Sequence, residues 1–128
     1  MKDIHFVGKI NVEIFKVITE DIQTDEVIIT EERIAHIANG HPDAARKYLG
    51  YLREIVENPC YIVEANKPYS ALILNPFSNG EELFKTVLRL KTSYDDPDFK
   101  NSIITFMNIN EKEWKRVLKN KKVLYKRE

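Results

Sequence analysis

The sequence predicts an α+β domain: two helices packed on one face of an antiparallel sheet of about four strands, followed by a short C-terminal helix. Two segments with helical periodicity and helix-boundary residues precede four segments with strand character. Short polar links join those four segments, and successive strands with short links pair antiparallel. The chain has 128 residues and is 43% hydrophobic, enough for one buried core. We therefore expect residues 1–128 to form a single domain.

The N-terminal segment has strand periodicity. Its apolar side chains alternate with polar ones at Ile10, Val12 and Ile14. A polar stretch then leads to a short apolar run at residues 27–29. This pattern predicts a hairpin or two loosely joined strands, with a strand or hairpin extension at about residues 1–26 ahead of the main domain.

Two helices should follow this extension. Thr30 is a good N-cap and two glutamates come directly after it, which predicts a helix over residues 31–39 with Gly40 as its left-handed C′ residue. Proline is favoured at the first helical position, so a second helix should run over residues 42–57. The apolar residues of this second helix fall on one side, facing the core. Asn58-Pro59 should end it.

The rest of the chain has strand character until its last quarter. Four strands are predicted at residues 60–65, 69–75, 83–91 and 102–109. Turn-forming Asn, Pro and Gly residues separate the first three of these strands, and a polar loop of about ten residues precedes the last. Asn110 and Glu113 resemble a capping box, so a final helix should begin there with Trp114, Val117 and Leu118 on its apolar side.

The charges are unevenly distributed, although the net charge is zero. Residues 1–64 carry 7 basic and 12 acidic side chains, whereas residues 65–128 carry 13 basic and 8 acidic ones. Between positions 112 and 128, eight Lys or Arg face two Glu. An anionic ligand such as a phosphate backbone should therefore bind the second half, unless these cations only keep the surface solvated.

The chain has no sequence signal for a membrane or for export. No run of about 18 apolar residues occurs, and the first residues lack the apolar stretch of a secretory signal. We therefore expect a cytoplasmic protein with no membrane partner.

Two histidines are candidates for acid–base chemistry. His36 lies nearly opposite the apolar side of its predicted helix, so it is not a core residue. His41 precedes Pro42, at about the N-cap of the second predicted helix. Unpaired N–H groups and the dipole at a helix start attract anions and favour the neutral imidazole that a general base requires. The alternative is that His41 merely caps a turn.

The predicted strand at residues 83–91 should carry a row of cations. Alternation places Lys85, Arg89 and Lys91 on one face and apolar side chains on the other. Cations at about 7 Å intervals match a phosphodiester chain, although they could also serve only solubility. In the last strand, the hydroxyl of Thr105 stands in an apolar run, where strand propensity alone could also explain it.

No motif indicates a metal or a cofactor. The sequence lacks CxxC, HExxH, GxGxxG and P-loop patterns. His36, His41 and Asp43 could supply metal ligands, but Pro42 restricts the backbone between them, so we predict no metal site and no cofactor.

The order of these motifs resembles the phage-associated nucleases of the barnase/EndoU/colicin/RelE-like fold. The stretches that carry the resemblance are TEERIAHI at residues 30–37, His41-Pro42, Glu57-Asn58-Pro59, the basic strand at residues 85–91 and IITF at residues 103–106. The resemblance covers roughly residues 27–124. It implies metal-independent RNA cleavage, in which a base activates the 2′-hydroxyl for attack on the adjacent phosphate and cations stabilise the added charge.

The resemblance also implies a role for each matching residue. His41 would be the base or acid, and His36 would bind phosphate or complete the pair. Arg89 would stabilise the transition state, and Thr105 would donate a hydrogen bond to a phosphate oxygen. Lys85 and Lys91 would bind the RNA backbone.

The neutral net charge departs from the basic character of many toxin-type ribonucleases. Two alternatives therefore stay open: a non-catalytic nucleic-acid-binding module, and a mobile-element accessory protein whose surface serves protein partners. RNA is the expected partner, and an inhibitor or antitoxin protein is a second candidate.

Overall fold

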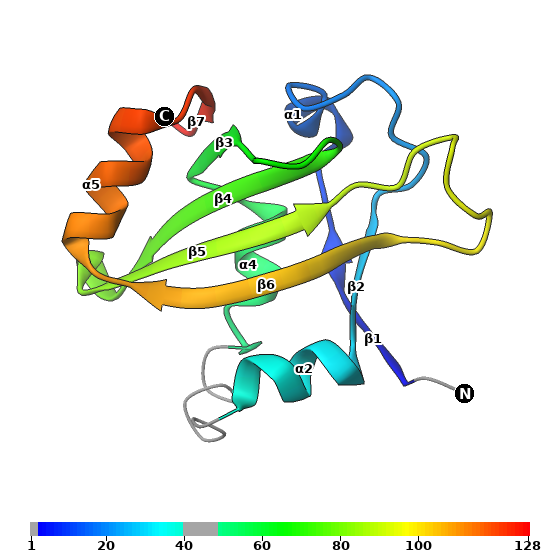
Figure 1. Cartoon of the computed structure of the whole chain (residues 1–128), viewed down its shortest axis with the longest axis horizontal. Coiled ribbons are helices and arrows are strands. Elements are labelled where there is room, and N and C mark those ends of the chain that lie inside the picture. Colours follow the sequence, from blue (N-terminus) through cyan, green and yellow to red (C-terminus); the bar gives the residue numbers. More distant parts are fainter. Residues whose placement is uncertain (1–2, 40–48) are drawn as a thin grey trace.

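A computed structural model describes residues 3–39 and 49–128 (Figure 1). These residues form an α+β fold around one mixed sheet of seven strands, in the order β1-β2-β6-β5-β4-β3-β7. The strands are β1 (Ile4–Lys9), β2 (Glu26–Thr30), β3 (Tyr61–Glu64), β4 (Ser70–Phe77), β5 (Glu82–Arg89), β6 (Asn101–Ile109) and β7 (Val123–Lys126). The helices are α1 (Val12–Phe15), α2 (Glu31–Ala38), α4 (Leu52–Glu57), the short 3-10 turn η1 (Ser78–Gly80) and α5 (Glu111–Asn120).

The four predicted strands form the antiparallel centre of the sheet. β3 pairs with β4, β4 with β5 and β5 with β6, each antiparallel. The prediction of an antiparallel sheet of about four strands is nevertheless wrong in two respects: the sheet has seven strands, and it is mixed. β1 and β2 extend one edge, where β2 runs parallel to β6, and β7 adds a strand beyond β3. The C-terminal basic segment therefore ends in a strand that pairs with β3.

The strand predicted from Ile10, Val12 and Ile14 is wrong. These residues follow β1 and lie in and before the short helix α1. The Asn11 side chain accepts a hydrogen bond from the backbone N–H of Glu13, which starts the helix. Phe15 ends α1 and is fully buried. A single N-cap and one core contact thus outweigh a period-two pattern of only three residues.

The first predicted helix is confirmed as α2, with Thr30 as its N-cap accepting a hydrogen bond from the Arg33 N–H. The second predicted helix is only partly confirmed. Residues 50–51 form a turn, and α4 begins at Leu52. Gly50 is a poor helix former, which accounts for the interruption. The predicted start of this helix, together with Gly40 and His41, lies outside the described residues.

The sheet has a core on each face. On one face, α1, α4 and the sheet enclose the larger core, centred on Phe15, Ile55 and Phe84. On the other, α5 packs through Val117 on Leu72 and Leu74 of β4. Figure 1 shows α4 behind the sheet and α5 near one end of the strands, so α5 leaves much of its own side of β4, β5 and β6 uncovered.

Candidate functional site

Strand β5 places its cations on the uncovered face. One face of the strand is fully buried, at Phe84, Thr86 and Leu88. The alternate residues are half-buried and line a pocket, and they are Lys85, Val87 and Arg89. The predicted alternation of this strand is therefore confirmed from Lys85 to Arg89. Lys91 lies beyond the end of β5 and does not line the pocket.

A β-bulge in β6 determines where Thr105 lies. Val87 pairs with Thr105, but the next residue, Leu88, pairs with Ile103, so Ile104 is an extra residue on β6. Simple alternation would put Ile103 and Thr105 on the same face. The bulge instead leaves Ile103 in the core and brings both Ile104 and Thr105 to the pocket. It thus directs the Thr105 side chain to the face that carries Lys85 and Arg89.

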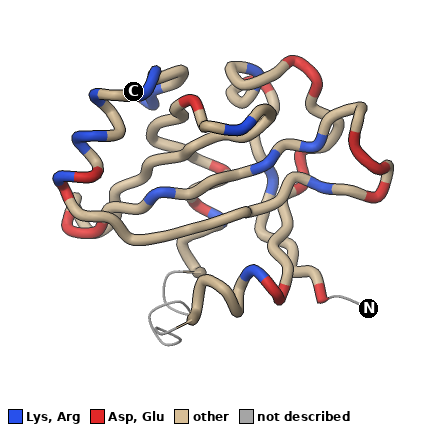
Figure 2. The backbone as a smooth tube through the Cα atoms, viewed as in Figure 1, with Lys and Arg blue, Asp and Glu red and all other residues tan. Residues whose placement is uncertain are grey.

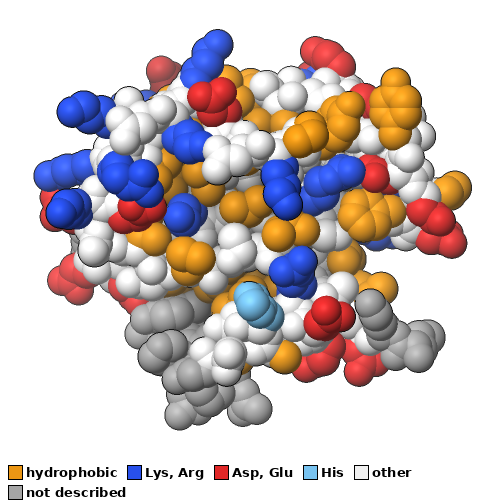
Figure 3. Space-filling model, in the orientation of Figure 1, with side chains coloured by type: hydrophobic (Ala, Val, Ile, Leu, Met, Phe, Trp, Pro, Cys, Tyr) orange, Lys and Arg blue, Asp and Glu red, His pale blue; other side chains and the backbone are white. Residues whose placement is uncertain are grey.

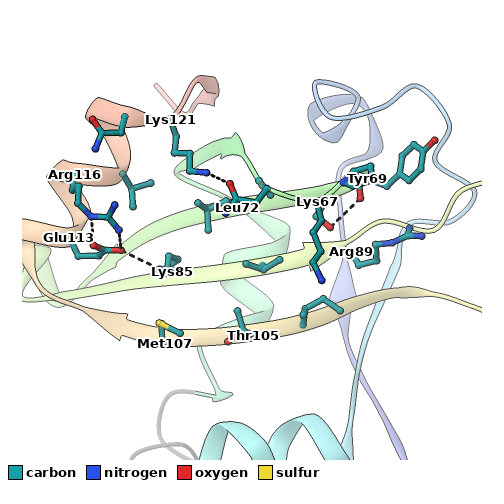
Figure 4. A pocket seen from close by; sticks show the side chains of 18 of the residues that line it. Lys67, Tyr69, Leu72, Lys85, Arg89, Thr105, Met107, Glu113, Arg116 and Lys121 are labelled. Atoms are coloured by element: carbon teal, nitrogen blue, oxygen red, sulfur yellow. Dashed lines mark hydrogen bonds and ion pairs between the residues drawn. The ribbon is translucent and has the colours of Figure 1, made fainter.

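The pocket lies over β4, β5 and β6 beside α5 and has a volume of about 930 Å³ (Figure 4). Its described lining is strongly basic. The cationic members are Arg33, Lys67, Lys85, Arg89, Arg116 and Lys121. Glu113 is the one carboxylate in that described lining. Figure 2 shows basic positions along β5 and α5, and Figure 3 shows Lys and Arg side chains around hydrophobic ones on this face.

Glu113 joins β5 to α5 through two cations. Its carboxylate accepts hydrogen bonds from Arg116 Nε and Nη2, each at 2.7 Å, and from Lys85 Nζ at 3.3 Å. The bonds from Arg116, with those from Lys85, lower the pKa of Glu113 to about 2. Glu113 is therefore charged at neutral pH and would be a weak base there. It contacts both Lys85 and Arg116 at the wall of the pocket and offsets part of their charge.

Arg89 is held at the opposite end of β5. Its Nη2 donates to Asp95 Oδ1 at 2.9 Å and its Nη1 to Asp95 Oδ2 at 3.2 Å. The rings of Tyr69 and Phe99 lie 5.5 and 5.8 Å from its guanidinium carbon. Asp95 also accepts from the Thr92 backbone N–H, and this bond, with those from Arg89, lowers the Asp95 pKa. Arg89 thus fixes the loop after β5. Because only some of its N–H groups are bonded to Asp95, its guanidinium also contributes positive charge to the pocket.

Among the described residues, neither His36 nor His5 lines the pocket. His36 is exposed in the last turn of α2, three residues after Arg33 and therefore on the same side of the helix. Arg33 does line the pocket. His41 lies outside the described residues. The third histidine, His5, is bonded to Glu31 at the start of α2.

Sequence reasoning predicted Lys85, Arg89 and Thr105 in this site and missed several members. Arg33, Lys67 and Glu113 were not predicted as site residues, although Arg33 lies in a stretch that carried the resemblance. Arg116 and Lys121 belong to the C-terminal basic segment, which was predicted only as a whole to bind phosphate. Nothing in the sequence distinguishes Lys67 from other lysines in turns. Lys91 instead donates to the Pro97 carbonyl at 2.8 Å.

Within residues 3–39 and 49–128, no group of three or more His, Cys, Asp or Glu side chains is arranged to hold a metal ion. None of the helices in this part of the chain has the length and apolar character needed to span a membrane.

The chain that forms this sheet and its basic pocket matches a nuclease family. Residues 2–126 match the family model described as phage-Barnase-EndoU-ColicinE5/D-RelE like nuclease2. Because the match covers nearly the whole chain, the protein belongs to this family, which confirms the resemblance drawn from the sequence. No curated protein and no solved structure matches the chain significantly.

Proposed function

We propose that this protein is a metal-independent endoribonuclease whose substrate binds in the basic pocket. The observation that carries the proposal is the composition of that pocket: six cations and one carboxylate among its described lining residues, on a chain of zero net charge. A phosphodiester supplies the opposite charge along its length. Membership of a nuclease family supports cleavage rather than binding alone.

The pocket residues have distinct roles in this proposal. Lys85 and Lys67 bind the phosphates on either side of the scissile bond, because both are amines that can approach a phosphate as point charges. Arg89 stabilises the negative charge that develops on the phosphate, using the N–H groups that Asp95 and the Leu90 carbonyl leave unoccupied. The Thr105 hydroxyl donates a hydrogen bond to a phosphate oxygen. No metal ligand is needed, because cationic side chains balance the charge.

Acid–base chemistry is assigned to the histidines. At neutral pH a histidine can accept the 2′-hydroxyl proton, whereas the guanidinium of Arg116 and the carboxylate of Glu113 are poorly suited to do so. His36 follows Arg33 by one helical turn, which favours its approach to a substrate that contacts Arg33. We propose His41 as the base or acid, with His36 binding phosphate or completing the pair.

Cleavage of a mixed pool of labelled RNA in EDTA tests the proposal. We expect the wild type to leave 2′,3′-cyclic phosphate ends, His41→Ala to lose activity while still binding RNA, and His36→Ala to lose activity. Lys67→Ala should weaken cleavage, whereas Lys115→Ala should not, because Lys115 pairs with Glu111 and does not line the pocket.

Two other results would replace the proposal. RNA binding without cleavage in the wild type would favour the non-catalytic binding module. Neither binding nor cleavage would favour an accessory protein that acts through protein partners, such as an inhibitor or antitoxin.

A further inference from the structure

Strand β1 lies at one outer edge of the sheet, and the first half of that edge has unused backbone groups (Figure 1). The Asp3 carbonyl accepts a hydrogen bond from the Glu31 N–H at 3.0 Å, so Asp3 directs its backbone groups toward β2. Successive residues of a strand direct these groups to opposite sides, so Ile4 and Phe6 direct theirs away from β2. In the described part of the chain, no other hydrogen bond reaches these outward groups. We call residues 4–6 the free edge.

The second half of β1 is covered by α4. The Glu57 carboxylate accepts a hydrogen bond from the Lys9 N–H at 3.4 Å. It also lies against Gly8, where an added Cβ would be 2.9 Å from Glu57 Oε2. Ile10 donates its N–H to the Asp25 carbonyl at 2.8 Å, so β1 turns back toward β2 beyond this point. The backbone available for pairing is therefore confined to the free edge.

The two outer edges of the sheet differ in their side chains. Lysines commonly protect edge strands from pairing with other chains. The strand β7 ends in Lys126 and lies between Lys122 and Arg127. The free edge has neither a lysine nor a proline, and its residues Ile4 and Phe6 are each 61% exposed. Only the β1 edge of the described sheet thus combines outward backbone groups with exposed apolar side chains.

We propose that the free edge pairs with the free edge of a second copy of this chain, which joins the two sheets in a symmetric dimer. This inference goes beyond the proposed function, because neither RNA nor the pocket takes part. In antiparallel pairing about a two-fold axis, His5 lies opposite His5 of the second copy, and Ile4 lies opposite its Phe6. Ile4 and Phe6 both direct their backbone groups outward, so each facing pair can exchange two hydrogen bonds. This register uses every outward backbone group of residues 4–6.

The side chains favour a second copy as the occupant. Ile4 and Phe6 are two residues apart and share one face of the strand. In the dimer each packs against the other residue of the second copy, so side chains that are exposed in one copy form an apolar cluster. Asp3 precedes β1 and Lys9 ends it, and both are exposed. Antiparallel pairing therefore brings the acidic end of each strand to the basic end of the other.

Sedimentation equilibrium of the whole chain without RNA, from micromolar to millimolar concentration, tests the proposal. We expect a reversible equilibrium in which the mass rises from 15.0 kDa toward twice that value. Phe6→Lys removes both Ile4–Phe6 contacts of the dimer at once, so the dissociation constant should rise at least about fivefold. Ile4→Lys should act in the same direction. Val17→Lys is the matched control, because Val17 is also apolar, is 40% exposed and lies outside β1, and it should dimerise as the wild type does.

A disulfide tests the register. Facing residues between two hydrogen-bonded pairs have Cα atoms about 4.5 Å apart, a separation that a disulfide can span. His5→Cys in a Cys60→Ala background should therefore form a covalent dimer on mild oxidation. Lys9→Cys in the same background is the control. Lys9 is also exposed in β1, but in this register it should lie more than about 20 Å from Lys9 of the second copy.

A chain that stays monomeric at millimolar concentration would overturn the proposal. So would a dimer that both Phe6→Lys and Ile4→Lys leave intact while circular dichroism shows them folded. Faster cross-linking of Lys9→Cys than of His5→Cys would overturn the pairing about His5. Association beyond the dimer would also overturn the proposal, because a two-fold interface closes on itself, whereas pairing of β1 with β7 of another copy would continue.

Discussion

Glu113→Gln tests whether the cations of the pocket contact an RNA backbone. Glu113 accepts hydrogen bonds from both Lys85 and Arg116, so it offsets part of their charge within the pocket. Glutamine has nearly the same shape but no charge. The substitution therefore changes the described lining from six cations against one carboxylate to six cations against none.

The expected effect follows from counterion release. For single-stranded nucleic acids, each additional neutralised phosphate changes the slope of log K against log salt by about −0.7. Raising the salt from about 50 to 200 mM is a fourfold change, so the variant should lose roughly 2.6-fold more affinity over this range than the wild type. At the lowest salt the variant should bind RNA more tightly than the wild type.

The assay is fluorescence anisotropy with an uncleavable single-stranded RNA, repeated at several salt concentrations. Glu111→Gln is the matched control. Glu111 also lies in the first turn of α5 and pairs with a lysine, Lys115, but it does not line the pocket. Both variants remove one negative charge and one first-turn acid, so their difference isolates the pocket.

The same slope and affinity in Glu113→Gln and Glu111→Gln would refute the reasoning, because a general change in net charge would then explain both. Weaker binding by Glu113→Gln at all salt concentrations would show instead that the carboxylate positions Lys85 and Arg116 for RNA.

Three further predictions concern the framework of the pocket. Thr86 is fully buried and its Oγ1 has no hydrogen-bond partner among the described residues, so Thr86→Val should raise the free energy of unfolding by about 1 kcal/mol in urea denaturation. Thr30→Ala removes the N-cap of α2 and should lower that free energy by about 1 kcal/mol, with weaker RNA binding through Arg33. The Asp95 pKa is lowered in the folded protein, so its contribution to stability is present above the unfolded pKa of 3.8 and is lost as the pH falls through the folded pKa. The difference in Tm between the wild type and Asp95→Asn should therefore be largest near neutral pH and shrink below pH 3.8; a constant difference would contradict this.

The parts of the fold that local sequence specifies were predictable. Thr30 and Asn110 each accept a backbone hydrogen bond at the start of a helix, as their positions before acidic residues indicated. The alternation in β5 also predicted correctly which side chains face the core. Phe84 and Leu88 are large apolar residues, and the face of the sheet that carries them is buried. Such signals lie within a few residues of the element that they define.

The parts that depend on distant pairing were not predictable in this way. Val123–Lys126 forms a strand because β3 offers it an edge. Its run of three apolar or aromatic residues lies between basic ones and is too short to indicate a strand by itself. The parallel contact between β2 and β6 joins segments more than 70 residues apart. A period-two pattern in one segment contains no information about either partner.

The bulge at Ile104 shows how one such pairing changes a functional prediction. The sequence placed a hydroxyl at Thr105 in the last strand, but alternation from Ile103 would have turned it into the core. The register with β5 shifts by one residue at this point, and that shift alone brings Thr105 opposite Val87, between Lys85 and Arg89. Strand propensity alone could explain a threonine here, but this pairing makes Thr105 a candidate phosphate ligand. Its position depends on the pairing of two strands, which neither strand encodes by itself.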